Sequence, residues 1–417
     1  IDLNNIELPV TICWFPEESN QYPRPLPHKA ARKLFVDVNN NAKPPSEARL
    51  VLLSDTKLEN IFSRELLNRL RDNEWKDYFP LYSVEYDNPN ANVTTPRRWS
   101  VITNLEILKD AVIKCIFGPP KLIEHMKPSL QGRTSVYDQN RHMRNQLKVG
   151  ELFPKEIEDG PRTLFRDNLS NENFPINNDN LHKKLLNAFY ERWGKGILYL
   201  LSHVLPYKAH LQALIDRYSS WTAGDNIQTL AKDALFEGVG MFWTIEEGHD
   251  LWKLQKKNAE DNKQIPPDQP DISKAWQILN GEQKNRFRER RAQIYLDTKN
   301  IPDPKATEEC NKLFKTIVTY AAQVGLVLAW ASIHRIAPKD SDYPVSIAKT
   351  ITSAINNALV TGPNKERSRK FIFLTSSELD SENFCPLNGI AKLDTPYSSY
   401  FRYFWLELIL RQDNKKI

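Results

Sequence analysis

Apolar residues recur at helical spacing along much of the chain, and only a few short runs have the character of strands. Residues 8–15 (LPVTICWF) form an apolar run that ends at Pro16, which predicts a buried strand. Residues 28–38 have the spacing of an amphipathic helix, which we expect to stop before Pro44. Ser46 is placed to cap a further helix that begins at Glu47.

The helical pattern becomes dominant further along the chain. Apolar positions from Leu105 to Ile116 predict an amphipathic helix that Gly118 closes. Residues 181–204 keep their apolar side chains on one helical face until Pro206 interrupts the pattern. Near the end, residues 370–376 (KFIFLTS) predict a strand, and residues 400–410 (YFRYFWLELIL) predict a hydrophobic closing helix.

Polar stretches divide this pattern into three segments. Residues 127–180 carry few apolar clusters and are expected to form an irregular connector, and the charged, Pro-rich residues 253–271 are expected to form a solvated loop. The predicted fold class is therefore α+β and predominantly helical. We expect an α+β unit at 1–126, the polar connector at 127–180 and a helical domain at 181–417.

Composition narrows the class of protein. The chain has 417 residues, of which 40% are hydrophobic, so it can bury a sizeable core. Its four cysteines lie far apart, so no CxxC pair exists and a reducing cytoplasm is expected. Residues 316–333 are uncharged, but their polar interruptions favour a buried helix, and we expect no membrane partner. The chain begins at Ile1 rather than Met, so we expect residues upstream.

Several kinds of catalytic site are excluded by their missing motifs. Gly194-Lys195 lacks the preceding glycine of a P-loop, and no GxSxG or HExxH sequence occurs. Glu246, Glu247, His249 and Asp250 form a dense acidic and imidazole group, but their spacing matches no metal-ligand motif. We interpret that group as a solvent-facing helix end and predict no metal site.

The most informative motif is residues 35–48, FVDVNNNAKPPSEA. The amides of Asn39, Asn40 and Asn41, the charge of Lys43 and the backbone N–H groups near Ser46 could together hold a phosphate. The alternative is an Asn-rich helix stop, because Asn tolerates left-handed backbone geometry.

The order of apolar strand, helix and Asn-rich turn resembles the ParB/sulfiredoxin-like superfamily, in which a helix ends in an ENxxR phosphate-binding motif. Asn40 and Lys43 match the Asn and Arg of that motif, while Asn39 replaces its Glu. More specifically, the segment resembles the DGQHR-domain branch, which includes DndB-like regulators of DNA sulfur modification. The DGQHR motif itself is missing from this chain. The resemblance covers residues 1 to about 120 and implies a partial ParB/sulfiredoxin-like core with a large helical extension.

Basic residues suggest a second kind of phosphate contact. The 57 Lys and Arg exceed the 52 Asp and Glu only slightly, so distribution matters more than net charge. Arg97 and Arg98 lie beside Trp99, and a basic string that contains Arg286 and Arg290 runs from Lys284 to Arg291. Arginine beside aromatic residues suits DNA, although each cluster alone is also typical of a solvated surface. A third cluster comprises Arg133, Arg141, His142 and Arg144.

The resemblance and these clusters together predict a DNA-interacting accessory or regulatory protein of a DNA-modification or defence system, with modification enzymes as further partners. The alternative is an NTP-hydrolysing enzyme partner in phosphorothioate or 7-deazaguanine insertion, using ATP or another NTP with Mg²⁺. In that case Asp37, or a motif residue outside this chain, would orient water or metal. A purely structural subunit is a third possibility.

Overall fold

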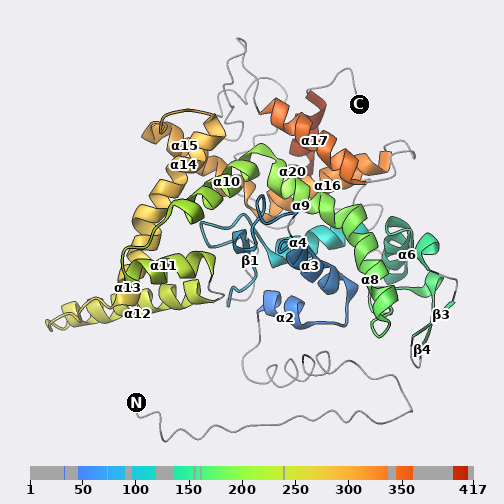
Figure 1. Ribbon diagram of the computed structural model, residues 1–417, viewed down its shortest axis with the longest axis horizontal. Coiled ribbons are helices and arrows are strands. Elements are labelled where there is room, and N and C mark those ends of the chain that lie inside the picture. The colour runs from blue at the N-terminus through green and yellow to red at the C-terminus, as the bar shows by residue number, and fades with distance from the viewer. Residues whose placement is uncertain are drawn as a thin grey trace, which may run out of the picture.

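The computed structural model describes residues 46–72, 74–89, 96–118, 135–153, 156–159, 162–237, 240–336, 344–359 and 398–411, together with Arg32. Most of these residues lie in helices, which confirms the predominantly helical class (Figure 1). The strand predicted at 8–15, most of the helix predicted at 28–38 and the strand predicted at 370–376 lie outside the described residues.

The described helices are spread over both halves of the chain. Those of the first half are α2 (Glu47–Leu53), α3 (Leu58–Arg69), α4 (Leu105–Val112), α6 (Val136–Gln146), α7 (Val149–Leu152), α8 (Asp179–Phe189) and α9 (Lys195–His203). Those of the second half are α10 (Leu205–Ser220), α11 (Asn226–Phe236), α12 (Met241–Asp261), α13 (Asp271–Ile278), α14 (Lys284–Leu296), α15 (Pro304–Ile317), α16 (Tyr320–Ile336), α17 (Pro344–Ala358) and α20 (Ser398–Arg411).

Short π-helical and 3-10 segments join some of these helices. The π-helical segment Ile113–Phe117 extends α4, Tyr190–Gly194 joins α8 to α9, and Leu279–Gln283 joins α13 to α14. The 3-10 turns are Leu81–Ser83 and Arg166–Asn168.

Two small sheets complete the described structure. Strands β1 (Val84–Glu85) and β2 (Thr103–Asn104) pair in parallel, with Val84 opposite Thr103. Strands β3 (Glu156–Asp159) and β4 (Arg162–Phe165) form an antiparallel hairpin, with Glu156 opposite Phe165.

Local signals account for several helix boundaries. The Ser46 hydroxyl accepts a hydrogen bond from the backbone N–H of Arg49 (3.4 Å), so Ser46 caps α2 as predicted. The Asn104 side chain accepts one from the N–H of Ile107 (2.8 Å) and starts α4, and the helical segment that follows ends before Gly118.

The main core is one cluster of buried side chains that extends from Ala48 in α2 to Ile409 in α20. It includes Met143 and Leu169 from the predicted connector, so the predicted boundaries at 126 and 180 do not separate independent cores in the described residues. Helix α16 lies in this core and packs along α20. The Trp405 indole N–H donates to the carbonyl of Ala322 (2.8 Å), which fixes the closing helix that the sequence predicted.

None of the described helices is by itself long and apolar enough to span a membrane; α15 and α16 pass that test only as a pair and are bent by 66°.

A second core is formed by α11, α12, α13 and the facing parts of α10 and α14. Figure 1 shows α11 to α13 at the left, projecting away from the main core. Trp221, Trp243 and Phe287 are buried in this second core. It approaches the first half of the chain through Tyr82 and Trp99, which pack against it.

Two predicted loops contain regular structure. The segment 127–180 includes α6, α7 and the β3–β4 hairpin. Its composition is polar because only a few of its side chains, such as that of Met143, reach the main core. Helix α12 continues to Asp261, nine residues into the predicted loop at 253–271. Its last turns are exposed, and Lys256 pairs with Glu260 one turn later. Helix propensity and pairs of solvated charges therefore explain why the helix continues where the apolar pattern ends.

Candidate anion-binding site

The segment that carries Arg97 and Arg98 is folded around a buried carboxylate. Glu85, at the end of β1, is 1% exposed. Its side chain accepts hydrogen bonds from the backbone N–H groups of Arg97 (3.1 Å) and Arg98 (3.0 Å) and from the amide of Asn88 (2.9 Å). These bonds fix the backbone immediately before Trp99.

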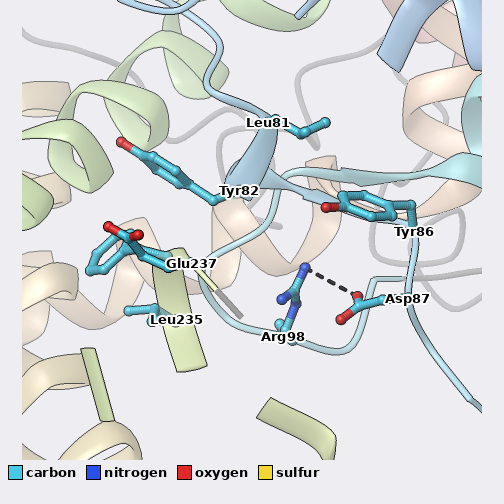
Figure 2. Close-up of a pocket in the computed structure, with 8 residues that line it drawn as sticks. Leu81, Tyr82, Tyr86, Asp87, Arg98, Leu235 and Glu237 are labelled. Atoms are coloured by element: carbon cyan, nitrogen blue, oxygen red, sulfur yellow. Dashed lines mark ion pairs between the residues drawn. The ribbon is translucent and has the colours of Figure 1, made fainter. Parts of the chain in front are cut away.

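Arg98 is buried at 6% exposure, so it does not extend the basic surface as the sequence prediction required. Its Nη2 donates to the carbonyl of Val84 (3.2 Å) and lies 3.5 Å from Oδ1 of Asp87, and its Nε lies 3.9 Å from Glu85. Figure 2 shows the ion pair with Asp87. Nearby carboxylates therefore balance the charge of Arg98.

Helix α14 distributes its basic residues over two faces. Arg286 pairs with Glu282, and Arg290 lies 2.6 Å from Asp216. These two residues, which the sequence analysis chose for DNA contact, each have a local acidic partner. Lys284, Arg288 and Arg291 are spaced four and three residues apart and therefore share another face of the helix.

That second face lines a cavity of about 220 Å³, which we call the basic pocket. Six cationic side chains line it, one of which is the buried Arg98, and no Asp or Glu is among its described lining residues. Trp99, Phe287 and Phe314 add aromatic walls. The cations come from three separate parts of the chain: Arg97 and Arg98; Lys284, Arg288 and Arg291; and Lys315.

Arg291 is the unusual member of the basic pocket. It is 5% exposed, donates to Oδ1 of Asn311 (3.1 Å), and its guanidinium carbon lies 3.9 Å from the ring centre of Phe314. No described Asp or Glu pairs with it, and its Nε has no hydrogen-bond partner. Burial lowers the pKa of Arg291 to about 9, so the side chain is still charged at neutral pH.

Neighbouring titratable groups do not supply the missing negative charge. Burial raises the pKa of the Cys310 thiol to about 12, which keeps it protonated. His210 is fully buried between Arg291 and the carbonyl of Ser100: its Nε2 lies 3.0 Å from that carbonyl and its Nδ1 lies 3.3 Å from Nη1 of Arg291. Burial, and then the charge of Arg291, lower the pKa of His210 to about 3, so its ring is neutral and Nδ1 accepts the hydrogen bond from Arg291.

The remaining cations interact unfavourably with one another. Burial lowers the pKa of Lys284, and the charges of Arg288 and Lys315 lower it further. An anion in the basic pocket would relieve this repulsion and balance Arg291. Guanidinium and ammonium groups together suit phosphate, because the first offers paired donors and the second a compact charge.

The residues predicted from the Asn-rich motif do not contribute to the described lining of the basic pocket. Asp37, Asn39, Asn40, Asn41 and Lys43 fall outside the described residues, whereas Ser46 is buried as the cap of α2.

The described arginines of the third basic cluster each have a local partner. Arg141 pairs with Asp138 (2.9 Å), and Arg144 donates to the carbonyl of Leu169 (2.8 Å).

The group at 246–250 lies within α12 rather than at a helix end, and His249 is buried with its Nδ1 at 2.8 Å from the hydroxyl of Ser273.

Comparison of the chain with protein-family models, with curated proteins and with solved structures finds no match.

Proposed function

We propose that the protein is a DNA-interacting accessory or regulatory protein that holds backbone phosphate in the basic pocket. The observation that carries this proposal is Arg291, a buried cation without a described carboxylate partner, at a cavity that five further cations line. A buried charge is normally paired, and the group that would complete this site is an anion from outside the described structure.

The surroundings favour nucleic acid as the source of that anion. Trp99 lines the pocket next to Arg97, and aromatic rings beside phosphate-binding cations are typical of strand-binding surfaces. The further proposal of a partial ParB/sulfiredoxin-like core and a role in DNA sulfur modification or defence, beside modification enzymes in the cytoplasm, rests on the sequence resemblance of residues 1 to about 120, and chiefly on residues 35–48. The basic pocket supplies an independent reason to expect DNA as a partner.

The alternative, hydrolysis of ATP or another NTP, finds less support. At about 220 Å³ the basic pocket is smaller than the roughly 300–1,000 Å³ of most small-molecule sites. Its described lining also lacks a carboxylate to bind the Mg²⁺ of a nucleotide. Asp37, Asn40 and Lys43, on which that alternative depends, lie outside the described residues.

Two arginines that lie two residues apart on α14, and therefore on different faces of the helix, give a matched test. Arg288 lines the basic pocket without a hydrogen bond or ion pair to the described residues, whereas Arg286 is solvent-exposed and pairs with Glu282. Arg288→Ala and Arg286→Ala change the net charge equally. Fluorescence anisotropy of labelled single-stranded and duplex DNA over a salt series measures both affinity and the number of phosphate contacts.

We expect Arg288→Ala to weaken DNA binding on the order of tenfold, and to reduce the slope of log K against log salt by about 1. Arg286→Ala should stay within about twofold of the wild type, because its neighbour Glu282 already balances its charge. Equal effects of the two substitutions would contradict a site in the basic pocket. An absence of DNA binding at low salt would remove the proposed function.

A further inference from the structure

A second cavity, of about 190 Å³, shares the side chain of Arg98 with the basic pocket (Figure 2). We call it the tyrosine pocket. Tyr82, Tyr86 and Phe236 form its aromatic lining, and the ring centres of Tyr82 and Phe236 lie 5.1 Å apart in an edge-to-face arrangement. Leu81 and Leu235 complete the apolar part. The residues come from the 3-10 turn before β1, from the loop after it and from the end of α11.

The polar lining is buried but incompletely satisfied. Asp87 is 7% exposed; its Oδ2 accepts from the N–H of Gly240 (2.7 Å), while its Oδ1 has no hydrogen-bond partner. The nearest guanidinium nitrogen of Arg98 lies 3.5 Å from that Oδ1, which is longer than a good charge-assisted hydrogen bond. The Nε of Arg98 also lacks a hydrogen-bond partner. Figure 2 shows both side chains in the wall of the pocket, with Glu237 across from them.

This combination matches the edge of a planar heterocycle. Aromatic side chains stack on bases, and buried polar groups select the base by its hydrogen-bonding edge. Two carboxylates, Asp87 and Glu237, can accept hydrogen bonds, and one guanidinium, Arg98, can donate them. Guanine presents two adjacent donors, N1–H and the N2 amino group, beside the acceptor O6, so it fits two acceptors and one donor best.

We propose that the tyrosine pocket binds a guanine base. This proposal rests on the proposed function when the base belongs to DNA: the base is then that of an unstacked nucleotide, and a backbone phosphate of the same strand lies in the basic pocket. Because Arg98 lines both cavities, base and phosphate would bind on two sides of one side chain. The shared chemistry also admits a free guanine nucleotide, which the experiment below distinguishes.

The test measures anisotropy of labelled oligo-dT that carries one central dG, dA, dC or abasic site, with the full chain. We expect the dG strand to bind on the order of tenfold more tightly than plain oligo-dT. Tyr86→Leu should remove most of that preference and leave the affinity for the abasic strand unchanged. Tyr78→Leu is the matched control, because Tyr78 is 59% exposed and does not line the tyrosine pocket.

Calorimetry with dGMP and dTMP identifies the source of the base. The guanine site is supported if dGMP binds, dTMP does not, and Tyr86→Leu weakens the binding of dGMP. If DNA does not bind in that case, the site is assigned to a free nucleotide. Affinities for all four strands within about twofold, together with equal binding of dGMP and dTMP, would overturn the guanine site. If Arg288→Ala still weakens every strand in that case, the proposed DNA binding stands without it. A consistent preference for another base would also overturn the assignment.

Discussion

Replacement of Arg291 by methionine tests the physical basis of the basic pocket. Burial lowers the pKa of Arg291 from the ordinary value of an arginine to about 9, and one pH unit corresponds to about 1.36 kcal/mol. The charged side chain therefore costs the folded state on the order of 5 kcal/mol at neutral pH. Arg291→Met removes this cost.

The same substitution removes favourable contacts. Nδ1 of His210 and Oδ1 of Asn311 each lose a donor, which costs about 1–3 kcal/mol per group. Contact of the methionine sulfur with Phe314 replaces part of the cation–π interaction. We therefore expect the free energy of unfolding at pH 7, without added anion, to change by no more than about 2 kcal/mol. A buried arginine with a carboxylate partner would instead lose about 3–5 kcal/mol.

Denaturant unfolding followed by tryptophan fluorescence, in phosphate and in chloride at equal ionic strength, measures these differences. Phosphate at about 100 times its dissociation constant should stabilise the wild type by about 2.7 kcal/mol and leave Arg291→Met unchanged. Any advantage of the variant should shrink as pH rises through about 9, because the wild-type side chain then loses its charge in the folded state. A loss of more than about 3 kcal/mol in the variant, with equal phosphate effects in both proteins, would refute the reasoning.

Three further substitutions test the fold. Gly196→Ala would place a Cβ against the ring of Trp330, so we expect a loss of about 1–3 kcal/mol by thermal denaturation. The overlap is identified as the cause if Gly196→Ala costs less in a Trp330→Leu background than in the wild type. Ser46→Ala removes the cap of α2 and should cost about 1 kcal/mol in urea unfolding, whereas Ser46→Asp should retain most of the stability. Glu106 is half-buried, and burial, followed by Glu47 and Asp110, raises its pKa to about 7. Because the folded state then binds the proton more tightly, this group lowers stability as pH rises from about 4.5 to 7; Glu106→Gln should equal the wild type at pH 4 and exceed it at pH 8, and parallel stability curves would contradict that shift.

Local signals made much of the helical structure predictable. The cap at Ser46, the amphipathic spacing that begins at Leu105 and the apolar run at 400–410 all identify helices that the structure contains. Each signal depends on side chains within a few turns of one another. The end of α12 escaped prediction because its final turns are polar on every side, so no apolar stripe distinguishes them from a loop.

The candidate site was predictable only in part. Basic residues near Arg97 and along 284–291 were identified as separate clusters, but nothing in the sequence shows that they line one cavity. The spacing of Lys284, Arg288 and Arg291 on one helical face was available from sequence alone. The choice of Arg286 and Arg290 overlooked it. Glu282 lies four residues before Arg286, so that pair was also available from the sequence, whereas only tertiary packing shows that Asp216 lies beside Arg290.

The pairing of α16 with α20 has a consequence for synthesis on the ribosome. Ala322 and Trp405 are 83 residues apart in the chain, and translation at about 5–20 residues per second places roughly 4 to 17 seconds between them. During that interval the nascent chain exposes the apolar surface of α16, because α20, which packs against it in the folded protein, has not yet been synthesised. We expect chaperones to engage α16 at this stage, and release of the chain before residue 398 to yield aggregates rather than a shortened native protein.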